Sequence, residues 1–482
     1  MRIPGQISPS RKISKFIFLF MTLVLNFAAI EFYYYFPHTA KALSHPITIQ
    51  SAQGPVINDP NLKAKIVFKG LNFPTSMAFL GPNDILVLEK NDGTVKRIVN
   101  GTILPHPLIH VNVANKAERG LLGIAVSRIK STNSTRPTTY VFLYYTESGG
   151  GKTGDDTTAG VKPLGNRLYR YELINDKLVN PKLLLNLPAS PGIAHNGGKM
   201  VIGPDNNVYV VIGDVNDDNY SNATTLAENV KGGRPADGRG GILRITQEGQ
   251  RVGKGILGDG FPLNLYYSYG IRNSFGMDFD PLTKTLWATE NGPRFGDQIE
   301  LVEPGHNSGW MQVQGIWKPH GVKAGDIMLH PESNLVDFSG KGKYRPPEFT
   351  WYGPDVGPTG LKFLNSDKLG RQYKDDMFVG DFHFGNLYHF KLNAQRNGLL
   401  LSGPLATKVA ANSTEPAIQS ILFGHGFGGI TDVQVGPDGY LYVLSLYAGG
   451  DNCDPIHPRP CIQYSSSLPG TIFRIAPNSN TK

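Results

Sequence analysis

Residues 435–443, which read VGPDGYLYV, contain the pattern that decides the fold of this chain. A Gly-Pro-Asp-Gly turn stands between β-branched and aromatic residues, an arrangement typical of a tight β-hairpin. Similar hairpins are predicted at residues 80–87, 202–210 and 279–287. The repetition of one hairpin along the chain predicts an all-β protein built from repeated units.

A second recurring pattern is a short strand of alternating apolar residues, often with an arginine, that we expect to close each unit. It occurs six times, at residues 95–98, 168–171, 242–245, 299–301, 387–390 and 472–475. Six units in about 420 residues leave roughly 70 residues each, which fits a four-stranded blade with an inserted loop. We therefore predict a six-bladed β-propeller over residues 66–478, preceded by a linker over 46–65. A two-sheet sandwich is the alternative.

The composition agrees with many short strands joined by turns. The 482 residues include 57 glycines and 35 prolines, and only 18% of them are charged. Long amphipathic helices would not give this profile. The formal net charge of +8 is spread thinly, without a basic run that has interleaved aromatic residues, so we do not expect a nucleic acid partner.

The first 45 residues have the features of a targeting segment. Basic residues before Phe16, an apolar run over 16–30 and a small-x-small sequence at 40–42 predict a signal peptide, with an uncleaved membrane anchor over 16–36 as the alternative. Either one places the rest of the chain outside the cytoplasm, secreted or on the outer face of the membrane.

Two further features fit that compartment. Cys453 and Cys461 bracket a loop with three prolines, which favours a local disulfide and an oxidising environment. Five Asn-x-Ser/Thr sequons permit N-glycosylation, at Asn100, Asn133, Asn219, Asn222 and Asn412.

Polar residues beside glycine-rich turns are the candidates for chemistry. His195 lies in a loop before a predicted strand, where a histidine accepts protons near neutral pH. Arg272 and Asn273, between two glycines, offer a forked cation and an amide that suit a carboxylate or a quinone oxygen. The Gly292-Pro293 turn exposes carbonyl oxygens of the kind that bind calcium.

Each of these segments also has a purely structural interpretation: a histidine bonded to a carbonyl, an arginine that bridges sheets, or a plain turn. A fourth segment, Glu118-Arg119, precedes a tight glycine-bounded step at 120–123. Phosphate-loop, zinc-protease, nucleophile-elbow and dinucleotide motifs do not occur in a suitable context, which argues against nucleotide, zinc-protease and serine-hydrolase chemistry.

Together these segments resemble the glucose/sorbosone dehydrogenase family of soluble quinoprotein glucose and aldose sugar dehydrogenases. The resemblance runs in order from about residue 70 to 476. It is carried by FPTSMAF (73–79), ERGLLG (118–123), HNGG (195–198), IGPD (202–205), GIRNSFG (270–276), ENGP (290–293), ITDV (430–433) and GPDG (436–439).

The resemblance implies a six-bladed propeller with pyrroloquinoline quinone (PQQ) across the mouth of its channel. His195 would be the general base on the anomeric hydroxyl of an aldose, and the C1 hydride would pass to the quinone. Arg272, with Asn273, would contact the quinone and substrate oxygens and assist catalysis. The carbonyls of Gly292 and Pro293 would hold a calcium ion. The product would be a lactone, and the electrons would leave to an external acceptor.

Four positions depart from the family pattern. Glu118 stands where a glutamine is common, and His383 stands where a basic residue is usual, although both positions are expected to bind the cofactor. Thr431, also at a cofactor-binding position, and Gly429 replace two arginines of the last blade. Each lost charge-assisted bond weakens binding of the tricarboxylate PQQ by about 1.5–3 kcal/mol. Arg119, Arg294 and Lys362 are the candidate cations for compensation.

Two other functions remain open on the sequence alone. The missing arginines suit a non-catalytic extracytoplasmic propeller that binds a glycan or a protein partner. A calcium-dependent hydrolase would need converging carboxylates, for which the candidates are Asp214, Asp217, Asp218 and Glu290. The aromatic residues Trp310, Trp317, His320 and Trp351 are expected either to line the sugar entrance or to pack within the sheets.

Overall fold

The computed structural model describes residues 54–130, 137–216, 223–293, 295–316, 334–353, 355–410, 416–446 and 469–478. They belong to one compact unit, Ala52–Lys482. The segment predicted as a signal peptide or anchor (1–45) and both cysteines lie outside these ranges. No helix within them is long and apolar enough to cross a membrane.

The regular structure of these ranges consists of strands and short 3-10 helices, so the all-β prediction is confirmed. The helices are η1 (Asp155–Thr157), η3 (Leu226–Glu228), η4 (Leu263–Leu265), η6 (Arg371–Tyr373), η7 (Gly403–Thr407) and η8 (Pro416–Ser420).

The strands form six sheets, which we number in chain order. The first sheet contains β3 (Pro74–Gly81), β4 (Asp84–Glu89), β5 (Thr94–Val99) and β6 (Thr102–Ile103), with β7 (Ile109–His110) also on β5. The second contains β8 (Leu121–Ile129), β9 (Thr138–Glu147), β10 (Gly165–Ile174) and β11 (Lys177–Leu187). The third contains β12 (Met200–Ile202), β13 (Val208–Ile212), β14 (Gly241–Ile245), β15 (Tyr266–Tyr269), β19 (His306–Asn307) and β20 (Lys343–Tyr344).

The remaining sheets follow the same plan. The fourth contains β16 (Met277–Phe279), β17 (Leu286–Glu290), β18 (Asp297–Val302), β21 (Phe349–Trp351) and β25 (Val409–Ala410). The fifth contains β22 (Pro358–Phe363), β23 (Met377–Asp381), β24 (Leu387–Phe390), β26 (Leu422–His425) and β1 (Val56–Ile57). The sixth contains β27 (Ile430–Val435), β28 (Leu441–Ser445), β29 (Gly470–Pro477) and β2 (Leu62–Leu71).

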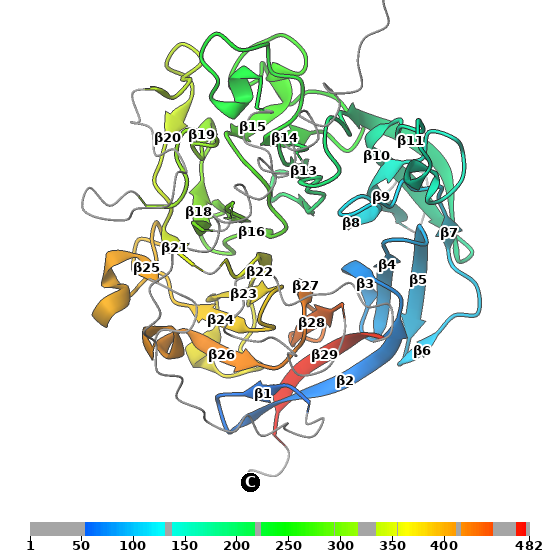
Figure 1. Ribbon diagram of the computed structural model, residues 1–482. Coiled ribbons are helices and arrows are strands. Elements are labelled where there is room, and N and C mark those ends of the chain that lie inside the picture. The colour runs from blue at the N-terminus through cyan, green and yellow to red at the C-terminus, as the bar shows by residue number, and fades with distance from the viewer. Residues whose placement is uncertain are drawn as a thin grey trace, which may run out of the picture. The chain divides into compact units, whose positions relative to one another are not determined.

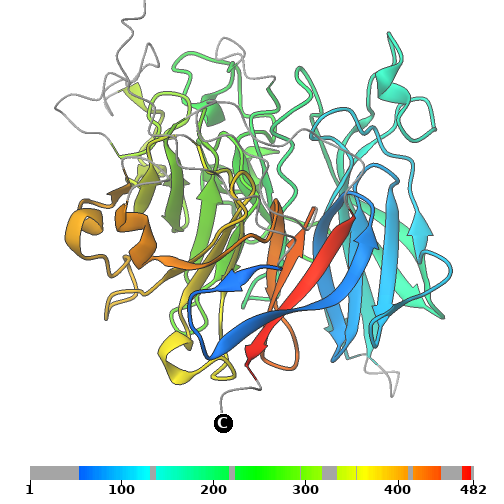
Figure 2. The same cartoon turned by 60° about the horizontal axis from the view of Figure 1, so that its bottom comes forward.

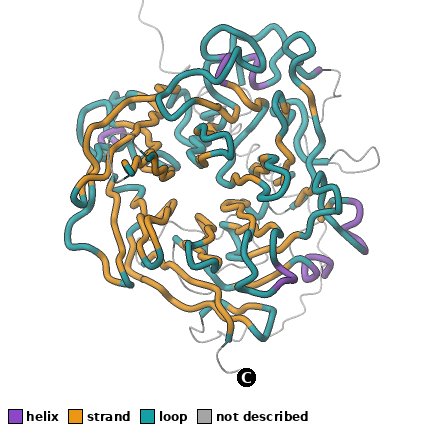
Figure 3. Tube along the Cα trace, turned by 180° about the vertical axis from the view of Figure 1, so that it is seen from behind, coloured by secondary structure: helices purple, strands orange, loops and turns teal. Residues whose placement is uncertain are grey.

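The sheets have a propeller arrangement around a common centre (Figure 1; Figure 3 shows it from behind). The innermost strands contact one another in a closed ring, in the order β3, β8, β12, β16, β22, β27 and back to β3. The sixth sheet joins segments from the two ends of the described chain, because β2 pairs antiparallel with β29 (Figure 2). Part of β2, and all of β1, lie in the range 46–65 that the sequence predicted as a linker.

The predicted hairpins are the first and second strands of their sheets, for example β27 and β28. The six strands expected to close each unit are instead the third strands, β5, β10, β14, β18, β24 and β29. That prediction was wrong because a fourth, outer strand pairs with each of them. In the sixth sheet this strand is β2, more than 390 residues away in the sequence, which no local pattern indicates.

The innermost strands all begin at one end of the ring. Thr75 near the start of β3 donates its hydroxyl hydrogen to the carbonyl of Leu121 at the start of β8, 2.8 Å away. Thr359 on β22 likewise bonds to the carbonyl of Ile430 on β27, at 2.7 Å. Because the second strand of each sheet is antiparallel to the first, loops that enter a first strand and loops that leave a second strand meet at this end. Functional residues of such folds lie in these loops.

Candidate active site

His195 lies at this end of the ring, in the loop that enters β12. Its backbone is left-handed, with φ of 58°, and its side chain is buried. The glycines after it allow the loop to pack closely, since a Cβ on Gly198 would lie 2.7 Å from the Cβ of Leu122. The HNGG sequence is therefore needed for the backbone path that presents the imidazole.

Asp214, which follows β13, orients this imidazole. The Nδ1 atom of His195 lies 2.6 Å from Oδ1 of Asp214. The other carboxylate oxygen accepts a hydrogen bond from the indole Nε1 of Trp310 at 2.8 Å. Burial raises the pKa of Asp214, but His195, Arg272 and Trp310 outweigh it, so that its pKa lies below the ordinary value. The ionised carboxylate selects the tautomer with a proton on Nδ1, which makes Nε2 the basic nitrogen.

Glu118 joins the loops of three sheets. Its Oε2 accepts hydrogen bonds from the backbone N–H of His195 at 2.6 Å and from Nδ2 of Asn273 at 3.2 Å. The histidine and the Arg272-Asn273 pair are 77 residues apart in the sequence, yet this one carboxylate contacts both segments. Glu118 therefore links the two segments as a hydrogen-bond acceptor, a role that the amide oxygen of a glutamine would also fill.

Arg272 is held from both sides by the loops around it. Its backbone N–H donates to Oε1 of Glu290 at 2.8 Å, and its Nη1 donates to the carbonyl of Asn291 at 3.0 Å. Its guanidinium carbon lies 5.6 Å from the ring centre of Trp310, within the range of a cation–π contact. Trp310 thus lies in the site, whereas Trp351 is fully buried in a core cluster of the fourth and fifth sheets. Trp317 and His320 lie outside the described ranges.

Glu290 and Asp214, two of the carboxylates considered for a hydrolase, have separate partners. Glu290 accepts from Arg272 and from the hydroxyl of Ser308, and burial raises its pKa to about 7. In the described part of the chain, no three His, Cys, Asp or Glu side chains converge as metal ligands. Asp217 and Asp218 lie outside it.

Asp297 supports the predicted calcium turn. Its Oδ1 accepts from the backbone N–H of Gly292 at 2.7 Å, and its Oδ2 accepts from the N–H groups of Val356 and Gly357 at 2.6 and 2.9 Å. Burial, together with Asp355, raises the pKa of Asp297 to about 6. A Cβ on Gly292 would lie 2.0 Å from the carbonyl oxygen of Phe295, so this tight turn requires glycine.

His383 is attached to the same loops. Its backbone N–H donates to the carbonyl of Val356 at 3.1 Å, and its Nδ1 lies 3.0 Å from the carbonyl oxygen of Asp355. Asp297 therefore connects the turn at Gly292 to the segment that holds His383.

The positions that lack arginine are occupied by compact packing. A Cβ on Gly429 would lie 3.1 Å from the ring of Phe382, and Thr431 bonds through its hydroxyl to the carbonyl of Leu444 at 3.4 Å. The expected compensating cations have other partners. Arg119 is buried against Asp156 at 3.1 Å, and Lys362 pairs with Asp278 at 2.9 Å. Arg294 lies outside the described ranges.

Three buried polar atoms of the site have no hydrogen-bond partner in the described structure: Oδ1 of Asn273, Oγ of Ser274 and Oδ1 of Asn291. Native proteins rarely leave such atoms unsatisfied. Amide oxygens accept hydrogen bonds from hydroxyl groups and also bind hard cations. This side of the site fits a ligand rich in hydroxyl groups and a calcium ion, and Arg272 and His383 fit an anionic cofactor. The neutral positions 429 and 431 do not supply the remaining charges.

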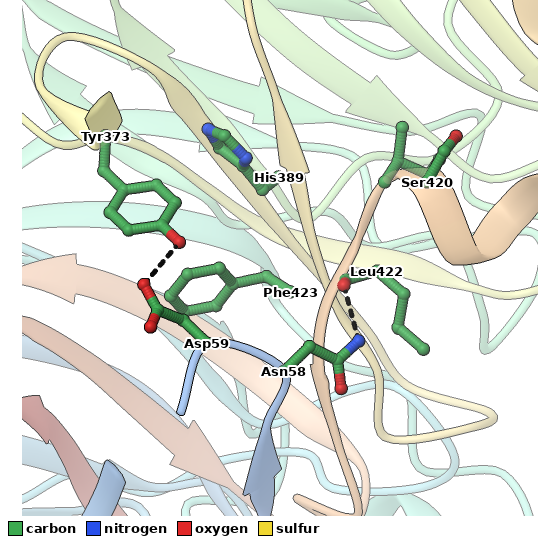
Figure 4. Close-up of a pocket in the computed structure, with 8 residues that line it drawn as sticks. Asn58, Asp59, Tyr373, His389, Ser420, Leu422 and Phe423 are labelled. Atoms are coloured by element: carbon green, nitrogen blue, oxygen red, sulfur yellow. Dashed lines mark hydrogen bonds between the residues drawn. The ribbon is translucent and has the colours of Figure 1, made fainter. Parts of the chain in front are cut away.

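A separate pocket lies where β1 joins the outer edge of the fifth sheet (Figure 4). It has a volume of about 270 Å³, and its polar contacts include a hydrogen bond from the hydroxyl of Tyr373 to Asp59 at 2.9 Å. None of the residues predicted for the site lines it.

Residues 71–452 match the family described as glucose/sorbosone dehydrogenase. The chain belongs to this family. It is 26% identical over 389 residues to the aldose sugar dehydrogenase YliI of Escherichia coli, with 79% of this chain and 89% of that protein covered. It is 28% identical over 300 residues to the quinoprotein glucose dehydrogenase B of Acinetobacter calcoaceticus, with 58% of this chain and 59% of that protein covered.

The solved structures support the fold of this glucose/sorbosone dehydrogenase family member. The PQQ-bound aldose sugar dehydrogenase of Streptomyces coelicolor superposes with a TM-score of 0.56 at 21% identity, covering 86% of this chain and 98% of that one. Both curated relatives named above are sugar dehydrogenases by name, so the family places this chain among oxidoreductases.

The sequence interpretation missed the environment of His195. Asp214 was considered only as a metal ligand, although it directly follows a second strand in the same unit as His195. The sequence does not decide between the sugar entrance and sheet packing for Trp310, and it gives no signal for Lys90, which contacts the Glu118 loop. The position of Asp214 at a strand end was the one signal that could have indicated its role.

Proposed function

We propose that this protein is a PQQ-dependent aldose sugar dehydrogenase that oxidises C1 of an aldose to the lactone. The observation that supports this proposal most strongly is the buried pair of His195 and Asp214, whose Nδ1 and Oδ1 atoms are 2.6 Å apart. Glu118 links this pair to Asn273, because it accepts hydrogen bonds from both His195 and Asn273. This arrangement provides a base of fixed tautomer beside polar groups suited to a sugar. Membership of the family indicates the class of reaction. We interpret the ring of six sheets as a six-bladed propeller.

In this proposal, Nε2 of His195 takes the proton of the anomeric hydroxyl while the C1–H bond breaks and a C1=O bond forms. PQQ, when bound, supplies the two-electron acceptor for the hydride, and the electrons leave to an external acceptor. Asp214 stabilises the imidazolium that forms on His195. General-base catalysis of this kind contributes about 10²–10⁴-fold to the rate.

The other residues would bind and orient. Arg272 and Asn273 would hold the oxygens of the cofactor and the sugar, with Glu118, His383 and Thr431 at the cofactor's edge. The carbonyls of Gly292 and Pro293 would hold a calcium ion, for which the bond from Gly292 to Asp297 fixes the turn. Because positions 429 and 431 carry no charge, we expect PQQ to bind more weakly than in relatives with arginines there.

We also propose that the catalytic domain acts outside the cytoplasm, secreted or attached to the outer face of the membrane. The N-terminal apolar run and the sequons support this location.

The test uses the full-length chain with added PQQ and calcium. The proposal predicts a quinone absorbance band and reduction of a dye by aldoses. His195→Ala should abolish turnover and keep the band, whereas Asn264→Ala, in the short helix η4, should change neither. A chain that shows no band at micromolar PQQ and no dye reduction would be a non-catalytic propeller, and the proposal would be wrong.

A further inference from the structure

Lys90 is a buried lysine that has no role in the proposed chemistry. It follows β4 at the same end of the ring, and only 8% of its surface is exposed. Its Nζ donates hydrogen bonds to the carbonyl oxygens of Ala117 and Arg119, both at 2.8 Å. These two residues are the immediate neighbours of Glu118, so the ammonium holds the loop on both sides of that carboxylate.

The loop is also packed against the rest of Lys90. The N–H of Leu121 donates to the carbonyl of Lys90 at 3.0 Å. A Cβ on Gly120 would lie 2.5 Å from Cγ of Lys90, so the loop approaches the lysine stem as closely as glycine permits. Ala117 has a left-handed backbone, with φ of 53°, which costs free energy in a residue with a side chain. The bond from Lys90 to the carbonyl of Ala117 offsets that cost.

The loop acts on the His195 segment through two side chains. Glu118 accepts from the N–H of His195 and from Asn273, as described above. Arg119 contacts the earlier part of the same segment: its Nη2 donates to the carbonyls of Ala189 and Gly192 at 2.7 and 2.8 Å. A shift of the loop would therefore move the segment 189–195 at both of its ends.

We infer that Lys90 is a positioning residue of the proposed sugar oxidation: its charged ammonium fixes the loop at 117–119, and Glu118 and Arg119 transmit that position to His195 and Asn273. The inference rests on the proposed function for its kinetic test. The geometry of the loop can be tested without it.

The charge of Lys90 makes its hold on the loop at 117–119 sensitive to pH. The charged groups that face the ammonium of Lys90 are the carboxylates of Glu118 and Asp156. The guanidinium of Arg119 forms an ion pair with Asp156. Burial lowers the pKa of Lys90 to about 8, although Glu118 and Asp156 oppose the shift. Above that pH the amine is neutral, and its bonds to the carbonyls lose the strength that the charge provides. We therefore expect the loop to loosen between pH 8 and 9.

Loss of activity in this range would not reflect unfolding caused by Lys90. The pKa of this lysine is lower in the folded chain than its usual 10.5, so the unfolded state binds more protons between about pH 8 and 10.5. Its contribution to stability therefore rises with pH while activity falls. A free energy of unfolding that rises with pH while kcat/KM falls is a combination that a merely structural lysine would not give.

The kinetic test compares full-length wild-type protein, Lys90→Met, Lys90→Arg and the control Lys408→Met, all with PQQ and calcium, from pH 6.5 to 9.5. We expect wild-type kcat/KM to fall above pH 8 and Lys90→Met to be reduced at least tenfold at pH 7, without that fall. Lys90→Arg should keep a charge to higher pH and so lose the alkaline fall. Lys408→Met, which removes a lysine paired with Glu348 at 2.7 Å outside the candidate site, should follow the wild type.

A measurement without cofactor keeps the inference testable if Lys90→Met does not fold. The ring resonance of His195 is followed by NMR in the wild-type chain without PQQ and identified by its loss in His195→Ala. An inflection of its chemical shift near pH 8 is expected. If the resonance shows no inflection between pH 7 and 9.5, or if Lys90→Met keeps wild-type kcat/KM and its pH profile, Lys90 does not position the site. Absence of dye reduction in the wild type with an NMR inflection near pH 8 would overturn the proposed function, and it would leave standing only the part of the inference in which Lys90 positions the loop at 117–119 and His195.

Discussion

The replacement Asp214→Asn tests the base assignment because the structure leaves the amide no good orientation. Oδ1 of Asp214 accepts from the His195 ring and from the N–H of Asn216 at 3.1 Å, and Oδ2 accepts from Trp310. If the amide NH₂ takes the Oδ1 position, it forces a proton onto Nε2 of His195 and faces the N–H of Asn216. If it takes the Oδ2 position, it faces the indole N–H instead.

The expected magnitude follows from these contacts. Loss of one charge-assisted bond costs about 1.5–3 kcal/mol, which is roughly 10- to 150-fold in rate. The wrong tautomer adds to this, and in a Ser-His-Asp triad the same exchange lowers kcat about 10⁴-fold. We therefore predict a loss of kcat between about 10²- and 10⁴-fold, with the quinone absorbance band retained.

The assay is dye reduction at saturating aldose, with the unfolding midpoint measured in parallel. Asp205→Asn is the matched control, because Asp205 lies in a turn of the same sheet and accepts from the hydroxyl of Tyr209 at 3.0 Å. It should keep wild-type kcat. If Asp214→Asn turns over within threefold of the wild type while folded, Asp214 does not orient a catalytic base, and the reasoning from His195 fails.

Three further predictions concern affinity, stability and location. Thr431→Arg restores a cation and should tighten PQQ binding about tenfold by absorbance titration, as expected for about 1.5 kcal/mol; an unchanged Kd would contradict the assigned cofactor edge. Asp432→Asn should lower the free energy of unfolding, measured in urea, by about 3–5 kcal/mol, because it leaves the buried Lys199, 2.5 Å from Asp432, without its carboxylate. A loss under 1 kcal/mol would mean that this ion pair does not stabilise the fold. Asn100 and Thr102 are exposed at a hairpin turn, so protein exported through a glycosylating secretory pathway should carry a glycan that Asn100→Gln removes by mass; an unmodified wild-type chain from such a host would refute this.

The sequence predicted local structure well because its signals are local. The turn at 435–443 joins two strands that follow each other directly in the sequence, β27 and β28, so its signal lies within one short segment. The third strands were recognised as strands but not as inner neighbours of a fourth. Their outer partners come from later segments or, for β29, from the opposite end of the chain.

The sequence singled out candidate residues one by one but did not predict their contacts. His195, Arg272 and Asn273 stood out because polar residues between glycines suit ligand loops. Their connections to Glu118, Asp214 and Trp310 depend on how the loops of three sheets meet, and the indole of Trp310 is 96 residues from Asp214. Lys90 gave no signal at all, because a single lysine after a strand is usually a solvated residue.

The oxidation of C1 can be tested most directly with an aldose that carries deuterium at C1. The account predicts a lactone product without that deuterium and a primary isotope effect on kcat/KM in the wild-type protein loaded with PQQ and calcium. A product that keeps the deuterium at C1, or a hydrolysed product formed without dye reduction, would contradict the proposal that this ring of sheets carries a sugar oxidation site.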